Sequence, residues 1–176
     1  MPILRLPTRV WHLAMPSPEA LRPARAPGPG VQVVRAEAPL GALNRFFYEE
    51  VGRPYHWVDR LEWTPARWQA YAERPELETW LVWERGTPLG FAELEGRADG
   101  AQRVNFFGLM RAGQGRGLGG HLLTEVVRRG WARGARRVEL DTCELDGPHA
   151  LANYRARGFE VRREAVEPRG RRTDGF

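Results

Sequence analysis

The spacing of apolar and polar positions predicts several short strands in the first two thirds of the chain. Residues 31–35 form a short apolar run, and residues 80–83 and 89–92 flank a polar Arg-Gly-Thr-Pro turn. A further apolar run at 103–110 follows a second polar turn. Consecutive strands joined by short turns are typical of antiparallel neighbours in one sheet.

Two helices are predicted between the first strand and this antiparallel group. Apolar residues recur at helical spacing from residue 39 to Gly52, where glycine ends the pattern. A second helix is predicted from Thr64-Pro65 to about Arg74, because a capping hydroxyl followed by proline is a good helix start.

The last third of the chain alternates between helix and strand. A glycine-rich loop at 111–120 precedes a predicted helix, and a strand at 137–143, a helix at about 148–157 and a strand from Phe159 follow. The sequence therefore predicts an α/β fold with a mixed, mostly antiparallel central sheet flanked by helices.

Proline and glycine divide the chain into three parts. Residues 1–30 contain many prolines, which exclude a long helix and predict a proline-rich N-terminal arm. Residues 31–168 are predicted to form a single domain, and residues 169–176 a polar tail. A length of 176 residues is typical of one compact domain.

Composition bears on membrane insertion, disulfide bonds and metal binding. No apolar run reaches the roughly 18 residues that cross a bilayer, so no membrane partner is expected and a cytoplasmic location is predicted. The single cysteine, Cys143, excludes an internal disulfide, and the four histidines show no metal-ligand spacing. No metal site is therefore predicted.

The charge balance does not by itself select a partner. The net charge is +5, and all 27 basic residues are arginine. A positive field attracts nucleic acid and a phosphorylated cofactor alike. The arginines between residues 128 and 137 are typical of the solvated face of an amphipathic helix, so a nucleic-acid partner is not expected.

The glycine-rich loop is the main candidate for chemistry. Residues 111–120 read Arg-Ala-Gly-Gln-Gly-Arg-Gly-Leu-Gly-Gly, directly after a predicted strand and directly before a predicted helix. Glycines let the backbone approach a ligand closely, and a helix N-terminus offers unpaired N–H groups to an anion. A diphosphate fits such a site.

The loop by itself is compatible with more than one class of diphosphate-containing ligand. Gly115, Gly117 and Gly120 match the G-x-G-x-x-G fingerprint of dinucleotide-binding proteins, and Glu139 and Asp141 follow about 20 residues later. However, that unit usually opens its domain, whereas a hundred residues precede this loop. A Walker-type nucleotide loop is excluded because the chain has no lysine.

Two motifs together resemble one family. Gln114-x-x-Gly117-x-Gly119 resembles the pyrophosphate motif of the GNAT N-acetyltransferase superfamily. Asn153-Tyr154, followed by Gly158-Phe159, is similar to the closing segment of the same family. The resemblance covers about residues 80–165, with the two motifs in the family's order.

The resemblance implies acetyl-CoA as co-substrate and an acetyl-CoA-dependent N-acyltransferase activity by direct attack in a ternary complex. The backbone of the loop would bind the pyrophosphate, with two arginines as helpers, and the end of the preceding strand would pair with the pantetheine arm. The implied cofactor-binding residues are Leu109, Met110, Arg111, Gln114, Gly115, Arg116, Gly117, Leu118, Gly119, Gly120, Asn153 and Tyr154.

The resemblance also implies catalytic roles. Tyr154 matches the family's general acid, which protonates the leaving thiolate. Many relatives carry a carboxylate on the strand before the glycine loop, but this chain has Asn105, which takes no proton at neutral pH. Glu93, Asp141 and Glu139 are the alternative bases, and proton loss to bulk water remains open.

The acceptor region implied by the resemblance lies in the first two helices and the loop between them. Aromatic walls with a few acids suit a small cationic amine, although the same aromatics also suit a core. These residues are Tyr48, Glu49, Glu50, Tyr55, His56, Trp57, Asp59 and Trp63. The predicted partner is a small-molecule or peptide amine, and a homodimer is left open.

Two other classes of function remain as alternatives. One is a non-catalytic module that binds CoA or nucleic acid, and the other is a dinucleotide-dependent oxidoreductase. Dinucleotide binding that resists competition by CoA would indicate the second.

Overall fold

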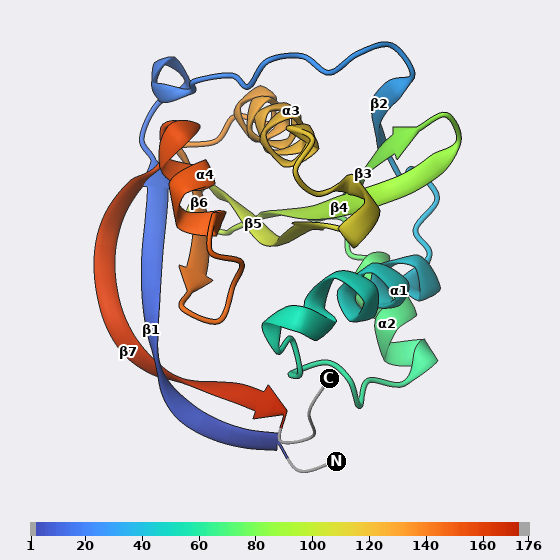
Figure 1. Cartoon of the computed structure of the whole chain (residues 1–176), viewed down its shortest axis with the longest axis vertical. Helices are drawn as coiled ribbons and strands as arrows, with labels where there is room; N and C mark the ends of the chain where they lie inside the picture. The colour runs from blue at the N-terminus through green and yellow to red at the C-terminus, as the bar shows by residue number, and fades with distance from the viewer. Residues whose placement is uncertain (1–2, 173–176) are drawn as a thin grey trace.

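A computed structural model describes residues 3–172, and all of its strands belong to one seven-stranded sheet (Figure 1). The strands lie in the order β2-β3-β4-β5-β6-β1-β7. Their bounds are β1 Ile3–Met15, β2 Val31–Arg35, β3 Leu77–Glu84, β4 Thr87–Gly96, β5 Ala101–Leu109, β6 Arg137–Cys143 and β7 Glu160–Arg172. Only β5 and β6 pair in parallel, which confirms the predicted mixed, mostly antiparallel sheet.

The predicted turns and caps explain several element boundaries. Arg85 and Gly86 join β3 to β4 with φ of 49° and 84°, and positive φ at both central residues matches the right-handed twist of a hairpin. The Thr64 side chain accepts a hydrogen bond from the Arg67 N–H at 3.2 Å, which caps the helix that begins at Pro65.

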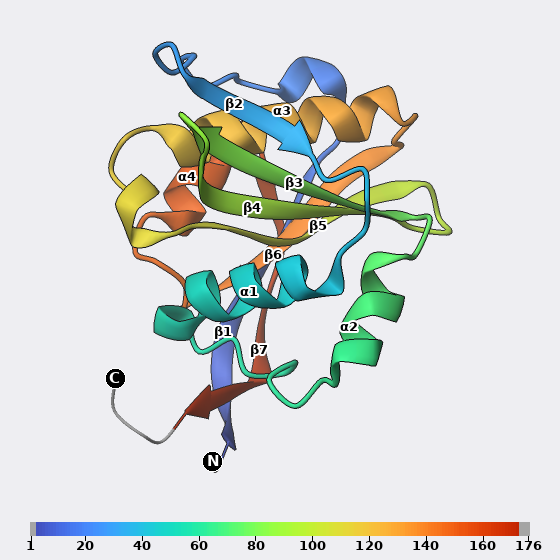
Figure 2. The same cartoon turned by 90° about the vertical axis from the view of Figure 1, so that its right-hand side faces the viewer.

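Helices cover both faces of the sheet (Figure 2). On one face lie α3 (Leu118–Ala132) and α4 (Ala150–Ala156), and on the other lie α1 (Gly41–Gly52) and α2 (Pro65–Ala72). Neighbouring residues of β3 therefore point into different clusters: Leu81 packs with Phe47 of α1, and Val82 belongs to the core beneath α3. This double coverage explains why β4 is buried along most of its length.

The N-terminal strand differs from the predicted proline-rich arm. Residues 3–15 form β1, which lies between β6 and β7 inside the sheet. Pro7 is paired with Pro168 of β7. Since neither proline can donate an N–H, this pair occupies a position where the two strands need not exchange hydrogen bonds. Strand pairing is thus compatible with a segment whose composition disfavours helix.

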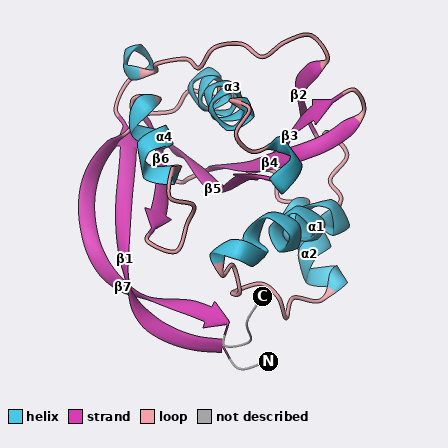
Figure 3. Ribbon diagram, viewed as in Figure 1, coloured by secondary structure: helices cyan, strands magenta, loops and turns pink. Residues whose placement is uncertain are grey.

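β1 and β7 continue beyond β6 as a two-stranded arm. β6 pairs only with residues 10–15 of β1, while β7 pairs with β1 from Ile3 to Ala14. The arm curves beneath α1 in Figures 1 and 3, and the Arg5 guanidinium lies 2.9 Å from the Asp59 carboxylate at its far end. Residues 169–172 of the predicted polar tail belong to β7, and residues 173–176 lie outside the described residues.

Residues 16–30 run over the top of the molecule from β1 to β2 (Figure 1). We call this segment the strap. The Arg22 N–H donates to the Arg157 carbonyl at 2.9 Å, and the Ala24 N–H donates to the Thr124 hydroxyl at 3.0 Å. The strap is thus fixed to the end of α4 and to α3.

Gly158 makes the contact between α4 and the strap specific for glycine. Its φ is +102°, and a Cβ placed there would overlap the Ala20 carbonyl oxygen. Gly134 also has a positive φ, +78°, but a Cβ there would meet no atom within 4 Å. These two glycines therefore separate the cost of the backbone conformation from the cost of the overlap.

We predict that Gly158→Ala destabilises the protein more than Gly134→Ala does. Left-handed backbone costs a non-glycine residue about 1–2 kcal/mol, and overpacking adds about 1–3 kcal/mol at Gly158 only. Urea unfolding should therefore give losses of about 1–2 kcal/mol for Gly134→Ala and about 2–5 kcal/mol for Gly158→Ala. Equal losses would show that the strap moves aside without cost.

Candidate active site

The two parallel strands separate in the middle of the sheet. β5 and β6 pair only through residues 101–104 and 137–140. At the same level the pairing of β4 with β5 shifts register, from Glu93 opposite Phe106 to Leu94 opposite Val104, so Asn105 is left without a partner. A β-bulge bends its strand and ends regular pairing, which accounts for the separation.

A cavity of about 740 Å³ occupies this gap and continues beneath the sheet. One end is lined by the glycine loop and the other by the segment after α1 and by Arg169 and Gly170 of the β1/β7 arm. The cavity thus joins an anion-binding loop to a pocket with aromatic walls, across the point where β5 and β6 separate.

The glycine loop presents its backbone to the cavity. Gly115 and Gly117 have φ of +73° and +75°, and a side chain added at either would meet no atom within 4 Å. Gly117 is the residue before α3, whose first N–H groups have no partner within the helix. The Gln114 amide donates to the Leu109 carbonyl at 3.1 Å, which holds the loop against the end of β5.

The structure brings most of the predicted cofactor-binding residues to the cavity. Those in its lining are Leu109, Gln114, Gly115, Gly117, Gly119, Gly120, Asn153 and Tyr154. Met110, Arg111, Arg116 and Leu118 are outside the lining. The Leu118 side chain is buried in the core beneath α3, and Met110 packs against the cluster of α1.

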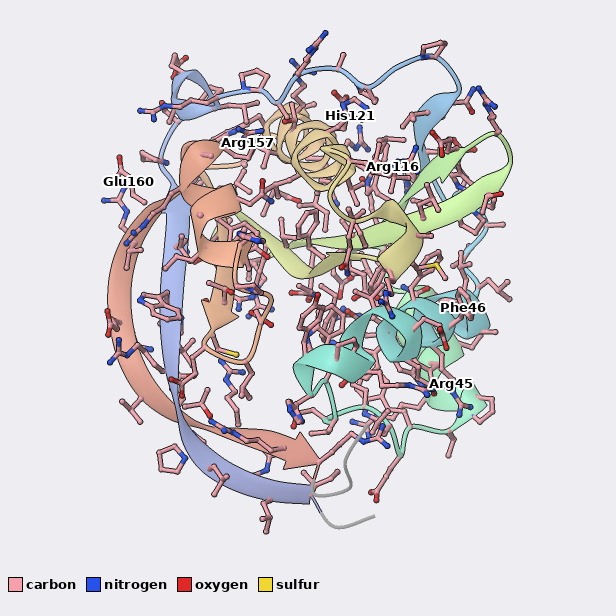
Figure 4. All side chains as sticks on the ribbon, in the orientation of Figure 1. Arg45, Phe46, Arg116, His121, Arg157 and Glu160 are labelled. Atoms are coloured by element: carbon pink, nitrogen blue, oxygen red, sulfur yellow. The ribbon has the colours of Figure 1, made fainter. Side chains whose placement is uncertain are left out.

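Arginine and histidine side chains lie around the first turns of α3 (Figure 4). Arg116, His121 and Arg157 are labelled in Figure 4, on the loop before α3, on α3 and after α4 respectively. Arg116 lies 2.5 Å from Glu84, whereas the Arg157 guanidinium lies against Gly120, 2.8 Å from the position a Cβ would take there. Positive charge beside a helix N-terminus is unfavourable by itself and favours a bound anion.

Tyr154 reaches the cavity from α4. Its ring packs between Phe107 at 6.0 Å and Phe159 at 6.3 Å, and the residue is only 7% exposed. Burial raises the pKa of the phenol, and the nearby Asp146 and Cys143 raise it further. The hydroxyl is therefore protonated at neutral pH.

Asp141 lines the cavity but is already engaged by an arginine and a histidine. Arg103 lies 2.6 Å from one carboxylate oxygen, and His12 Nδ1 lies 2.7 Å from the other. The second ring nitrogen of His12 lies 2.8 Å from Glu167. Asp141 thus belongs to a charge network across β5, β6, β1 and β7. Glu139 joins the same network through Arg103, at 3.7 Å, and also lies 2.9 Å from Arg137.

Glu93 is placed away from the cavity, beneath α1 and α2. It is 1% exposed and accepts hydrogen bonds from the Tyr71 hydroxyl at 2.5 Å and from the Asn44 amide at 2.7 Å. Burial raises the pKa of its carboxyl group, and Arg60, 3.8 Å away, opposes that shift. Glu93 is linked to the cavity indirectly, through Tyr71. The Tyr71 hydroxyl lies 3.4 Å from the side-chain amide of Asn105, which lines the cavity.

The predicted acceptor region is divided between cavity and core. Tyr48, Tyr55, His56, Trp57 and Asp59 line the cavity. Glu49, Glu50 and Trp63 do not, and Trp63 packs against Trp68, 5.0 Å between ring centroids. The aromatic residues therefore serve both as cavity wall and as hydrophobic core.

The loop from β6 to α4 supplies residues that the sequence analysis did not select. Asp146 and Gly147 line the cavity, together with Thr142 at the end of β6. The signal for them was modest: an acid three residues after the predicted strand at 137–143. Cys143 and His149 also line the cavity, and burial raises the pKa of the Cys143 thiol.

Two further classes of site receive no support from residues 3–172. Within that range, no group of three or more His, Cys, Asp or Glu side chains is arranged to hold a metal ion. Nor does any helix there combine the length and apolarity that a membrane crossing requires.

Comparison with known proteins agrees with this arrangement. Residues 42–159 match the model of the acetyltransferase (GNAT) family. No curated protein matches the chain. A GCN5-related N-acetyltransferase from Sphaerobacter thermophilus is 25% identical with a TM-score of 0.70, over 94% of this chain and 52% of that one.

Two more solved structures show the same fold at lower identity. A GCN5-related N-acetyltransferase from Kribbella flavida is 21% identical with a TM-score of 0.67, over 98% of this chain and 61% of that one. A tandem GNAT protein from the clavulanic acid biosynthesis pathway is 17% identical with a TM-score of 0.58, over 93% and 54%. The chain therefore spans little more than half the length of these structures.

Proposed function

Because the chain belongs to the GNAT acetyltransferase family, we propose that it transfers the acetyl group of acetyl-CoA to an amine. The observation that carries this proposal is the single cavity that joins the glycine loop, the gap between β5 and β6, and Tyr154. A loop that binds diphosphate, a slot for an extended thiol arm and a proton donor are the three parts that this reaction needs.

The residues around the cavity suit each part of acetyl-CoA. The backbone of Gly115–Gly120 would bind the pyrophosphate, as helix N-termini bind anions. The free edge of β5 beyond Val104 would pair with the pantetheine arm in the manner of an added strand. Arg157 would contribute positive charge beside the same helix end.

Transfer would proceed by direct attack in a ternary complex. The acceptor amine would approach from the aromatic end of the cavity, while Tyr154 would protonate the leaving thiolate. A small-molecule or peptide amine fits an acceptor pocket walled by Tyr48, Tyr55 and Trp57. The fold disfavours a dinucleotide enzyme, because the glycine loop follows three antiparallel strands instead of opening a parallel sheet.

We predict that acetyl-CoA binds with a Kd on the order of micromolar and that NAD does not bind. Isothermal titration calorimetry with each ligand tests this. Release of free CoA should then follow addition of an amine from a panel of spermidine, kanamycin and phenylalanine amide. Binding of NAD in place of acetyl-CoA, or acetyl-CoA binding with no transfer to any primary amine, would contradict the proposal.

A further inference from the structure

Three aspartates line the cavity, and they differ in their charge partners. Asp59 pairs with Arg5 at 2.9 Å, and Asp141 pairs with Arg103 and His12. Asp146 has no arginine or histidine nitrogen within 4.0 Å among residues 3–172. Of the three, Asp146 alone keeps its negative charge available to a ligand.

Hydrogen bonds fix the Asp146 carboxylate through one of its two oxygens. Oδ2 accepts a hydrogen bond from the Thr142 hydroxyl at 2.6 Å and from the Cys143 N–H at 3.0 Å. The Asp146 N–H in turn donates to the Cys143 carbonyl at 3.0 Å, which closes a tight turn. In the described part of the chain Oδ1 makes no hydrogen bond, so one lone-pair face remains open.

The surroundings of Asp146 contain the proposed acid and an aromatic wall. Asp146, Tyr154 and Cys143 line the same cavity, and Asp146 contributes to the raised pKa of the other two groups. Arg169 also faces this group from β7, but its guanidinium lies 3.1 Å from Glu167. Tyr55 lies against Gly147, the residue after Asp146, with its hydroxyl 3.4 Å from the position of a Cβ there.

We propose that Asp146 binds the ammonium group of a cationic acceptor and takes its proton, as the general base of the reaction. This inference rests on the proposed function. It assigns the role to a residue in the loop after β6, in place of Glu93, which lies outside the cavity, and Asp141, whose two oxygens already face Arg103 and His12. Carboxylate and aromatic ring together favour a primary amine that is positively charged.

The protons balance over one turnover. The acceptor ammonium gives one proton to Asp146, and the neutral amine attacks the thioester carbon to form the new C–N bond. The C–S bond then breaks, and the thiolate takes a proton from the Tyr154 hydroxyl. The nitrogen returns its second proton to the phenolate, which leaves amide, free CoA and one proton on Asp146 for release to water.

Asp146→Asn tests the role while it preserves the turn, because the amide oxygen can still accept from Thr142 and Cys143. We expect kcat to fall about 100-fold at neutral pH, the lower end for general base catalysis, since solvent in the open cavity partly replaces the carboxylate. The activity should recover as pH rises toward the pKa of a free amine, near 10. The Kd for acetyl-CoA should not change.

Asp99→Asn is the matched control. Asp99 is also a turn aspartate that accepts a backbone hydrogen bond, from Ala101 at 3.1 Å, but it lies on the β4–β5 turn outside the cavity. The Asp99→Asn change removes one carboxylate charge, as Asp146→Asn does, and should leave kcat and its pH profile unaltered. Asp146→Glu keeps the carboxylate and should retain the wild-type shape of the profile at a lower rate.

The outcomes separate the inference from the proposed function. If wild-type protein binds no acetyl-CoA, the proposed function fails and the inference fails with it. If wild type is active and Asp146→Asn has its full activity at every pH, only the inference is overturned. A loss of the same kind in Asp141→Asn and not in Asp146→Asn would instead assign the base to Asp141.

Discussion

Replacement of Gly117 with tryptophan is expected to raise the Kd for acetyl-CoA at least about 100-fold. This corresponds to a loss of about 2.8 kcal/mol of binding free energy. Gly117 has a φ of +75° and stands immediately before α3, where an added side chain would project into empty space. That space is where the proposed diphosphate lies against the helix N-terminus. An indole there would displace the ligand and strain the loop.

The control for this change is Gly134→Trp. Gly134 has nearly the same backbone conformation, with a φ of +78°, and equally open surroundings, but it lies after α3 and outside the cavity. Both variants should lose similar stability, since both force a bulky residue into left-handed backbone. Calorimetric titration should show normal affinity in Gly134→Trp. Equal affinity in both variants would mean that the ligand does not contact the loop.

Replacement of Tyr154 with phenylalanine is expected to lower kcat about 1,000-fold, in the middle of the range for loss of a general acid. The ring is buried between Phe107 and Phe159, so phenylalanine preserves the packing. Because the residue is only 7% exposed, water cannot readily replace the missing hydroxyl. The loss of kcat should therefore exceed the loss that follows removal of the base, Asp146, in the open part of the cavity.

Steady-state kinetics at saturating acetyl-CoA measures this effect, and the Kd for acetyl-CoA should stay within a few-fold of wild type. A thioester of a more acidic thiol offers a sharper comparison. Its leaving group needs less protonation, so the difference between wild type and Tyr154→Phe should shrink. If the difference stays the same for both thioesters, the hydroxyl acts on a step other than departure of the thiolate.

Local patterns were sufficient for the elements whose signals are local. The β3–β4 hairpin depends on its own turn residues, and α2 begins where Thr64 can cap it. The glycine loop owes its conformation to glycine itself, at Gly115 and Gly117. Each of these features is encoded within a few residues, so sequence reasoning found them.

The other features of the fold and of the site depend on residues far away in the sequence. β1 is a strand because β6 and β7 pair with it, at separations of more than a hundred residues. Whether an aspartate in the cavity is neutralised is equally non-local: Arg5 reaches Asp59 from the arm, and Arg103 reaches Asp141 from β5. No pattern around Asp146 indicates that it is left without such a partner.

The position of β1 between β6 and β7 also determines when this strand can pair during synthesis. During synthesis β1 leaves the ribosome before β6 and β7, because both of these neighbours are made after residue 136. At about 5–20 residues per second, β1 waits roughly 10–30 s before β7 is complete. Until β6 is made, the apolar residues of β1, Val10 and Leu13 among them, have no native partner strand. Pro7, which has no N–H to donate, would limit the pairing of this strand with other strands in the meantime.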